Sequence, residues 1–262
     1  MYLAGIQYTS CIMGWPIQIS RMHRLYYTLR GIRRLQGNTF TRPLRVPITL
    51  DLMVQLHIQF HRRFNYMDFT MLKAASLLAF FGMFRASEYL ISHRTHFDPA
   101  VTLTVKDIKF SNNHSHITVR IKQSKTDPFR VGCNITIWAN NGRMCPVTAL
   151  RWYQLQHPHT GPLFTFRDGT YLSRQQFSSI IQQCIPDLNL NTHSFRIGGA
   201  SSAYAAGIPE TTIQTLGRWS SDAYRLYIRC PDTIIQHAQT LMSQTDTCDP
   251  WYPNIEGKEG TR

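Results

Sequence analysis

Between residues 216 and 229 the chain reads Leu216-Gly217-Arg218-Trp219-Ser220-Ser221-Asp222-Ala223-Tyr224-Arg225-Leu226-Tyr227-Ile228-Arg229. This stretch places one indole N–H donor and two phenols among arginines. A phenol, with an unperturbed pKa of about 10, becomes a nucleophile at neutral pH only where cations favour the phenolate or a base takes its proton. Two tyrosines within four residues also fit ordinary core packing. The stretch alone therefore leaves chemistry and packing open, and helical periodicity does not separate Tyr224 from Tyr227.

A second polar group precedes this stretch at His193-Ser194-Phe195-Arg196. Residues three apart share one face of a helix, so the imidazole and the guanidinium would lie together near a helix N-terminus, where anions bind. Gly198 and Gly199 follow, and such small residues let a helix approach a neighbour closely. The pattern indicates an anion-binding helix, although His-x-x-Arg alone is not specific.

Two further cationic side chains lie upstream. Arg85 directly follows the apolar run from Ala74 to Phe84, which predicts a guanidinium held rigidly at the end of a buried helix, with Glu88 close enough to orient it. Lys125 lies where the second strand of a predicted sheet turns into the third. A lysine on a hairpin tip is a candidate proton donor, and a solvated turn residue is the alternative.

The periodicity of the apolar residues predicts a mainly helical α+β fold. Between residues 101 and 138 three short runs alternate in polarity, with a turn at 111–114, which predicts a small three-stranded antiparallel sheet. Residues 230–243 carry apolar residues at helical spacing and are a candidate segment for exchange between subunits. Apolar residues at helical spacing, or capping residues, predict helices over 19–34, 49–64, 68–83, 146–156, 173–184, 193–206, 209–217 and 221–229.

The charge balance predicts a polyanionic partner. The 262 residues include 28 Lys plus Arg against 15 Asp plus Glu, a formal net charge of +13, and 22 of the basic residues are arginines. Only 16% of the residues are charged, against about 25% in typical proteins, and 43% are hydrophobic, which excludes a disordered acidic chain. Nucleic acid is the commonest polyanion, and arginine suits bidentate phosphate contacts.

Cysteine usage and hydropathy exclude other classes of protein. The six cysteines lack CxxC or zinc-finger spacing, and no partnered carboxylate cluster accompanies the histidines, so we expect no metal site and a reduced, intracellular chain. The longest apolar run is too short to cross a bilayer. Residues 1–50 contain no acidic residue. The arginines near 19–34 form a candidate DNA-binding face, and Arg218 is a further candidate. These arginines are Arg21, Arg24, Arg30, Arg33 and Arg34.

The candidate side chains occur in the order that resembles the active-site set of the tyrosine recombinase (phage integrase) family, which is Arg, Lys, His-x-x-Arg, His or Trp, and Tyr. Here they are Arg85, Lys125, His193 with Arg196, Trp219 and Tyr227. The stretches 124–130, 193–198 and 216–229 are similar to recombinases of eukaryotic DIRS-like and Crypton-like mobile elements. Trp219 stands where many members have His.

The resemblance implies a domain organisation. Residues 46–243 would form the catalytic domain, and residues 1–45 resemble only the last part of the family's helical core-binding domain. Residues 244–262 lack periodicity and are expected to form a tail. The implied partner is double-stranded DNA, bound by a homotetramer on paired sites, and the implied location is the nucleus.

The implied reaction is DNA strand cleavage and rejoining through a 3′-phosphotyrosine, with no metal, ATP or other cofactor. Tyr227 would be the nucleophile, with Tyr224 as its rival, and Lys125 would protonate the leaving oxygen. His193 would act as a base or phosphate ligand, and Trp219 would donate to the phosphate. Arg85 and Arg196 can supply the positive charge that a metal supplies elsewhere.

Two other functions are compatible with this sequence pattern. One is a DNA-binding protein derived from a mobile element, which keeps the fold without exchanging strands. The other is an enzyme similar to type IB topoisomerases, which nicks and relaxes DNA as a monomer. Covalent trapping on DNA separates the first alternative, and relaxation without strand exchange identifies the second.

Overall fold

The computed structural model describes residues 2–37, 44–92, 97–125, 127, 129–140, 142–157, 161–229, 234–236 and 239–240. The chain divides into two compact units at Leu44 and Arg45, whereas the sequence places the boundary after residue 45. The role of the first unit as a core-binding segment stays a prediction. The expected tail, 244–262, lies outside the described residues.

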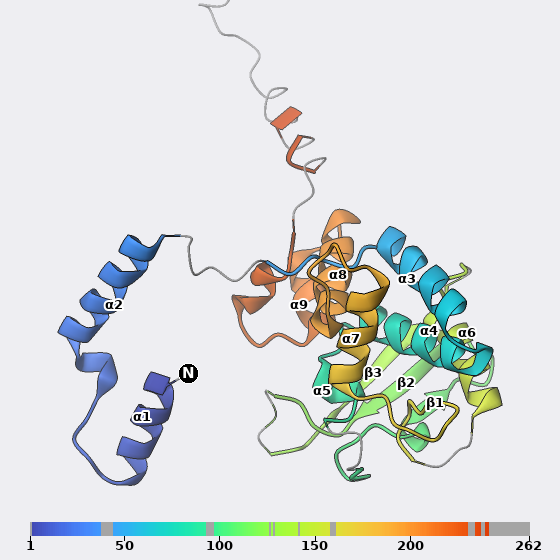
Figure 1. Cartoon of the computed structure of the whole chain (residues 1–262), viewed down its shortest axis with the longest axis horizontal. Coiled ribbons are helices and arrows are strands. Elements are labelled where there is room, and N and C mark those ends of the chain that lie inside the picture. Colours follow the sequence, from blue (N-terminus) through green and yellow to red (C-terminus); the bar gives the residue numbers. More distant parts are fainter. Residues whose placement is uncertain are drawn as a thin grey trace, which may run out of the picture. The chain divides into compact units, whose positions relative to one another are not determined.

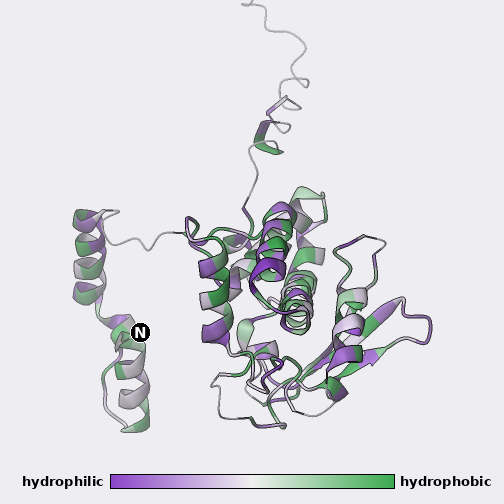
Figure 2. Cartoon of the chain, turned by 45° about the vertical axis from the view of Figure 1, so that its right-hand side comes forward, coloured by the Kyte–Doolittle hydropathy of each residue, from purple (hydrophilic) through white to green (hydrophobic). Residues whose placement is uncertain are grey.

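The first unit contains two helices, α1 (Tyr2–Ile12) and α2 (His23–Gln36). The helix expected over 19–34 is divided, because a 3-10 turn at Ile19–Arg21 precedes α2 and Met22 between them has non-helical backbone angles. Figure 2 shows hydrophilic and hydrophobic residues along both helices. No residue of α2 is buried, so its arginines and its apolar side chains are both accessible within this unit.

The second unit holds the remaining helices, and most begin where the sequence predicts. The Thr49 hydroxyl accepts a hydrogen bond from the backbone N–H of Leu52, and the Ser173 hydroxyl accepts one from Gln176, as expected for residues that cap helices. The helices in chain order are α3 (Leu50–Arg63), α4 (Tyr66–Phe81), α5 (Ala86–Tyr89), α6 (Pro146–Gln156), α7 (Arg174–Cys184), α8 (Thr192–Ala205) and α9 (Glu210–Gly217).

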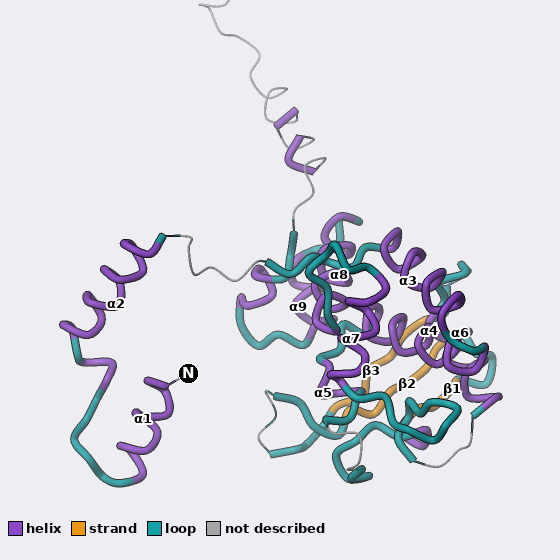
Figure 3. Tube along the Cα trace, viewed as in Figure 1, coloured by secondary structure: helices purple, strands orange, loops and turns teal. Residues whose placement is uncertain are grey.

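The predicted sheet is confirmed. Its strands, β1 (Ile108–Phe110), β2 (His116–Ile121) and β3 (Cys133–Trp138), are antiparallel in the order β1-β2-β3 (Figure 3). The first strand is shorter than expected, because residues 105–107 form a 3-10 turn instead of extended chain. The Asp107 carboxylate causes this turn by accepting hydrogen bonds from both the backbone N–H and the hydroxyl of Thr104.

The core of this unit surrounds α4, which is buried along most of its length and contacts α3, α6 and α8 (Figure 1). Two glycines of α8 allow the closest contacts. A Cβ at Gly198 would lie 1.9 Å from the carbonyl oxygen of Ile48, and one at Gly199 would lie 2.5 Å from that of Phe80. The slim helix expected from the sequence is therefore required, and it brings α8 against the backbone at the end of α4.

The prediction of the last helix is wrong. Instead of a helix over 221–229, residues Asp222–Leu226 form a 3-10 turn, here called η3, which begins where the Ser221 hydroxyl accepts from the N–H of Ala223. Of the candidate exchange segment 230–243, residues 234–236 and 239–240 are helical and the others lie outside the described residues. Among the described helices, none combines the length and the apolar character that spanning a membrane requires.

Candidate active site

The buried carboxylate of Glu88 joins two arginines that lie far apart in the sequence. Arg85 Nη1 donates to Glu88 Oε1 at 2.9 Å, and Arg218 Nη2 donates to Glu88 Oε2 at 2.8 Å. Burial raises the pKa of Glu88, but the charge of Arg218 and the hydrogen bonds from Arg85 outweigh it, so the net pKa lies below the ordinary value. Glu88 is therefore ionised at neutral pH, and the predicted orientation of Arg85 by this residue is confirmed.

Arg196 is fully buried in α8, which is unusual for an arginine. Its two terminal nitrogens donate to backbone carbonyls, Nη1 to Met83 and Nη2 to Gly217 at 2.6 Å. Burial, together with the charges of Arg85 and Arg218, lowers the pKa of Arg196 to about 9. The side chain is still protonated at neutral pH, so the site holds three guanidinium groups against one carboxylate.

Trp219 and Tyr227 lie over this guanidinium. The Arg196 Cζ is 4.2 Å from the centre of the Trp219 ring and 5.6 Å from that of Tyr227, and the two aromatic rings are 5.1 Å apart. Gly217 makes room for the indole, because a Cβ there would lie 1.6 Å from the Trp219 ring. The Tyr227 ring also makes an edge contact with the His193 ring, with the centres 5.1 Å apart.

The structure separates the two tyrosines that periodicity leaves equivalent. The hydroxyl of Tyr224 donates to the Glu210 carboxylate at 2.7 Å, and this side chain is buried. Tyr227 is partly exposed, and its ring lies among His193, Trp219 and Arg196. Tyr227 is therefore the phenol that shares the site with the cations.

His193 is partly buried among positive charges. Burial and the charges of Arg45, Arg196, Arg174 and Arg85 lower the pKa of His193 to about 4. The imidazole is consequently neutral at physiological pH, so it can accept a proton or donate a hydrogen bond.

Lys125 reaches the cluster only through its neighbour in the sequence. The Ser124 hydroxyl accepts from Arg85 Nη1 at 3.0 Å and donates to Glu88 at 2.9 Å, which ties the β2–β3 connection to the arginine cluster. Lys125 follows immediately and is exposed. The structure thus places it next to Ser124, with no hydrogen bond or ion pair to the other five predicted residues. Ser124 itself was not predicted, because a serine before a lysine carries no signal of its own.

Two buried donors in this cluster have no acceptor. Among the described residues, neither Nε of Arg196 nor Nε1 of Trp219 has a hydrogen-bond partner. Buried polar groups are nearly always satisfied, so two unpaired N–H groups beside stacked cations indicate a place for an anion that brings acceptor oxygens. No group of three or more His, Cys, Asp or Glu side chains that could hold a metal ion occurs in the part of the chain that the structure describes.

The predicted DNA-binding arginines fall into two kinds. Those near residues 19–34 are exposed, and their role stays a prediction. Arg218 differs, because its terminal nitrogens are engaged by Glu88 and by the backbone carbonyls of Gly82 and Met83. A direct DNA contact of Arg218 stays a prediction as well, but the structure gives its guanidinium partners within the protein.

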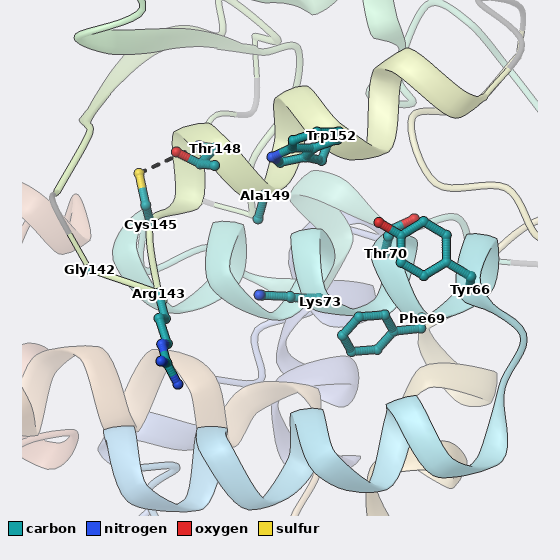
Figure 4. A pocket seen from close by; sticks show the side chains of 10 residues that line it. All are labelled: Tyr66, Phe69, Thr70, Lys73, Gly142, Arg143, Cys145, Thr148, Ala149 and Trp152. Carbon is teal, nitrogen blue, oxygen red and sulfur yellow. Dashed lines mark hydrogen bonds between the residues drawn. The ribbon is translucent and has the colours of Figure 1, made fainter.

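A cavity of about 270 Å³ lies elsewhere, between α4 and α6 (Figure 4). Phe69 and Lys73 of α4, Trp152 of α6 and Arg143 before α6 line it, and burial lowers the pKa of Lys73. None of the six predicted catalytic side chains takes part. The arginine cluster, and not the cavity, therefore marks the candidate active site.

Comparison with solved structures shows that the chain has a known fold. The XerH site-specific recombinase, in a post-cleavage complex with its palindromic difH substrate, superposes with a TM-score of 0.55 at 16% identity, over 77% of this chain and 55% of its own. The described fold is that of a tyrosine recombinase catalytic domain. XerA recombinase gives a TM-score of 0.52 at 16% identity, over 78% of this chain and 66% of its own.

A third structure with the recombinase fold is the Tn1549 transposon integrase in complex with a circular intermediate DNA, with a TM-score of 0.52, 16% identity, and coverage of 79% of this chain and 67% of that one. This chain therefore spans about half to two thirds of the length of these recombinases. No protein-family model and no curated protein matches the sequence. The likeness to DIRS-like and Crypton-like elements stays a prediction.

Proposed function

We propose that this protein is a site-specific DNA recombinase or integrase that cleaves and rejoins strands through a 3′-phosphotyrosine. The observation that carries the proposal is the placement of the partly exposed Tyr227 over Arg196, beside Trp219 and His193. Such a cluster can hold a phosphodiester and present a phenol to it. The recombinase fold supports the same conclusion, and the solved XerH and Tn1549 structures contain DNA.

The first step is cleavage of one strand. The Tyr227 oxygen attacks phosphorus, the bond from phosphorus to the 5′ oxygen breaks, and the phenol proton passes to the neutral His193. Lys125 donates a proton to the leaving 5′ oxygen. Arg85 and Arg196 stabilise the charge that develops on the non-bridging oxygens, and Trp219 donates its unpaired indole N–H to one of them.

Rejoining is the reverse reaction. The 5′ hydroxyl of another strand attacks the phosphotyrosine, and the Tyr227 oxygen leaves. Because the covalent link conserves the phosphodiester bond, this exchange needs no ATP. The proposed partner is double-stranded DNA, contacted chiefly through phosphates, so that affinity falls as salt rises. A homotetramer on paired sites and a nuclear location complete the proposal.

The test is covalent trapping on a pool of nicked duplexes of randomised sequence, in which the cleaved 5′ fragment diffuses away. We expect the wild-type protein and Tyr224→Phe to form a protein–DNA adduct that survives denaturation, and Tyr227→Phe to form none. The converse result for the two tyrosines contradicts the assignment. DNA binding without any adduct favours the DNA-binding alternative, and supercoil relaxation by a monomer without strand exchange favours the topoisomerase alternative.

A further inference from the structure

Arg218 ends α9 in a left-handed conformation, with φ 58° and ψ 43°, and its side chain folds back onto the protein. Nη1 donates to the carbonyl oxygens of Gly82 at 2.9 Å and Leu216 at 3.2 Å. Nη2 donates to Glu88 at 2.8 Å and to the carbonyl oxygen of Met83 at 3.3 Å. Both terminal nitrogens are therefore engaged, which leaves them no N–H for a phosphate.

Two of these acceptors also hold the other arginines of the site. The Glu88 carboxylate accepts from Arg85, and the Met83 carbonyl accepts from Arg196. Arg218 thus shares one acceptor with each of the two guanidinium groups proposed to clamp the phosphate. The charge of Arg218 contributes to the lowered pKa of Arg196, which is consistent with this closeness.

The backbone at the shared carbonyl is strained. Met83 has φ 46°, a left-handed value that a residue with a side chain adopts only when its surroundings fix it. Arg218 has the same kind of backbone, and its Nη2 binds the Met83 carbonyl. Two strained residues from segments 135 positions apart thus hold each other in place.

We propose that Arg218 is a positioning residue: it fixes the Glu88 carboxylate and the Met83 carbonyl, and through them the distance between the Arg85 and Arg196 guanidinium groups. This inference rests on the proposed strand-cleavage function. It differs from a direct DNA contact of Arg218, which the sequence alone predicts. A small misplacement of catalytic groups costs about 10²-fold in rate, so the effect is measurable.

The experiment compares Arg218→Gln, Arg218→Lys and Arg151→Gln, which removes the same charge from an exposed position of α6. We measure single-turnover adduct formation at saturating DNA, DNA affinity over a series of salt concentrations, and thermal unfolding. Arg218→Gln is expected to slow adduct formation about 10²-fold with unchanged DNA affinity and salt dependence. Arg218→Lys should recover part of the rate, because one ammonium group cannot reach all the acceptors. Arg151→Gln should cleave normally.

Two results overturn the inference while leaving strand cleavage intact. One is a loss of affinity in Arg218→Gln with a salt slope reduced by about one phosphate contact, and normal cleavage at saturation. The other is a cleavage rate equal to that of the wild type. If the wild-type protein itself forms no adduct, the proposed function fails. The contact between Arg218 and Glu88 is then tested by thermal unfolding. The losses of stability caused by Arg218→Gln and Glu88→Gln should be non-additive, and additive losses would contradict the contact.

Discussion

The guanidinium carbon of Arg196 lies 4.2 Å from the centre of the Trp219 ring, and both side chains are buried. Stacking on an aromatic face favours the charged form of an arginine, and two backbone carbonyls hold its terminal nitrogens. Among the described residues, Nε of Arg196 and Nε1 of Trp219 have no hydrogen-bond partner. The pair is thus ordered by the protein before an anion arrives, which is the preorganisation that electrostatic catalysis needs.

Arg196→Lys tests this arrangement, because lysine keeps the charge but cannot span both carbonyls. We expect cleavage to fall by about 10²-fold or more, the typical effect of removing one transition-state donor. The rate is measured as adduct formation in a single turnover. The control is Arg120→Lys on β2, which should cleave normally. Near-normal cleavage by Arg196→Lys would show that the clamp is not needed.

Tyr224→Phe removes the hydrogen bond that the phenol donates to Glu210 and the one that it accepts from Arg225 Nε. The expected loss in the free energy of unfolding is about 1 kcal/mol or less, because Glu210 is partly exposed to water. Urea unfolding measures this loss. A loss of several kcal/mol would contradict this account of Tyr224.

His57 makes stability sensitive to acid. Burial and the charge of Lys73 lower the pKa of His57 to about 3, below its ordinary value of 6.5. The unfolded chain therefore binds a proton that the folded chain does not, so this contribution is complete above pH 6.5 and is lost as the pH falls toward 3. One such proton changes the free energy of unfolding by about 1.4 kcal/mol per pH unit.

His57→Leu should accordingly flatten the fall in stability between about pH 6 and pH 4, as followed by urea unfolding at each pH. The exposed His61 of the same helix provides the control, and His61→Leu should keep the wild-type dependence. Equal pH dependence in wild type and His57→Leu would mean that other groups cause the acid sensitivity. His193, with a pKa lowered to about 4, adds to the slope in both proteins.

Gly198→Ala is expected to destabilise the protein by about 1 to 3 kcal/mol, because its methyl group would press on the carbonyl of Ile48. Gly31→Ala is the matched control. Gly31 also lies within a helix, but nothing lies within 4 Å of its added Cβ, so alanine should not destabilise there. Calorimetric melting compares the two. Equal melting temperatures would show that α8 can move away from Ile48.

The sequence predicts those parts of the fold that depend on local chemistry. The helices after Thr49 and Ser173 begin as expected, because a hydroxyl that accepts from the next turn acts within four residues. The run at Val101–Val105 is not a strand, because a side chain two positions further on, Asp107, turns the backbone. The helix expected over 221–229 is a short 3-10 turn.

The candidate site, too, could be predicted only in part from the sequence. The order of the side chains predicts that Arg85, His193, Arg196, Trp219 and Tyr227 belong together, and the structure groups them. Two of the groups that hold them are backbone carbonyls, of Met83 and Gly217, and a carbonyl has no sequence signature. The choice between the two tyrosines likewise depends on where a distant carboxylate lies.

The 3-10 winding of η3 determines how the rings of Tyr224 and Tyr227 are oriented relative to each other. A 3-10 helix advances about 120° per residue and an α-helix about 100°, so over the three steps from Tyr224 to Tyr227 the two geometries diverge by about 60°. Rewinding this turn as an α-helix would rotate one ring away from the indole they both contact. The 3-10 winding therefore keeps both rings against the indole, and the Glu210 carboxylate holds the Tyr224 hydroxyl, so that Tyr227 is the phenol beside the cations.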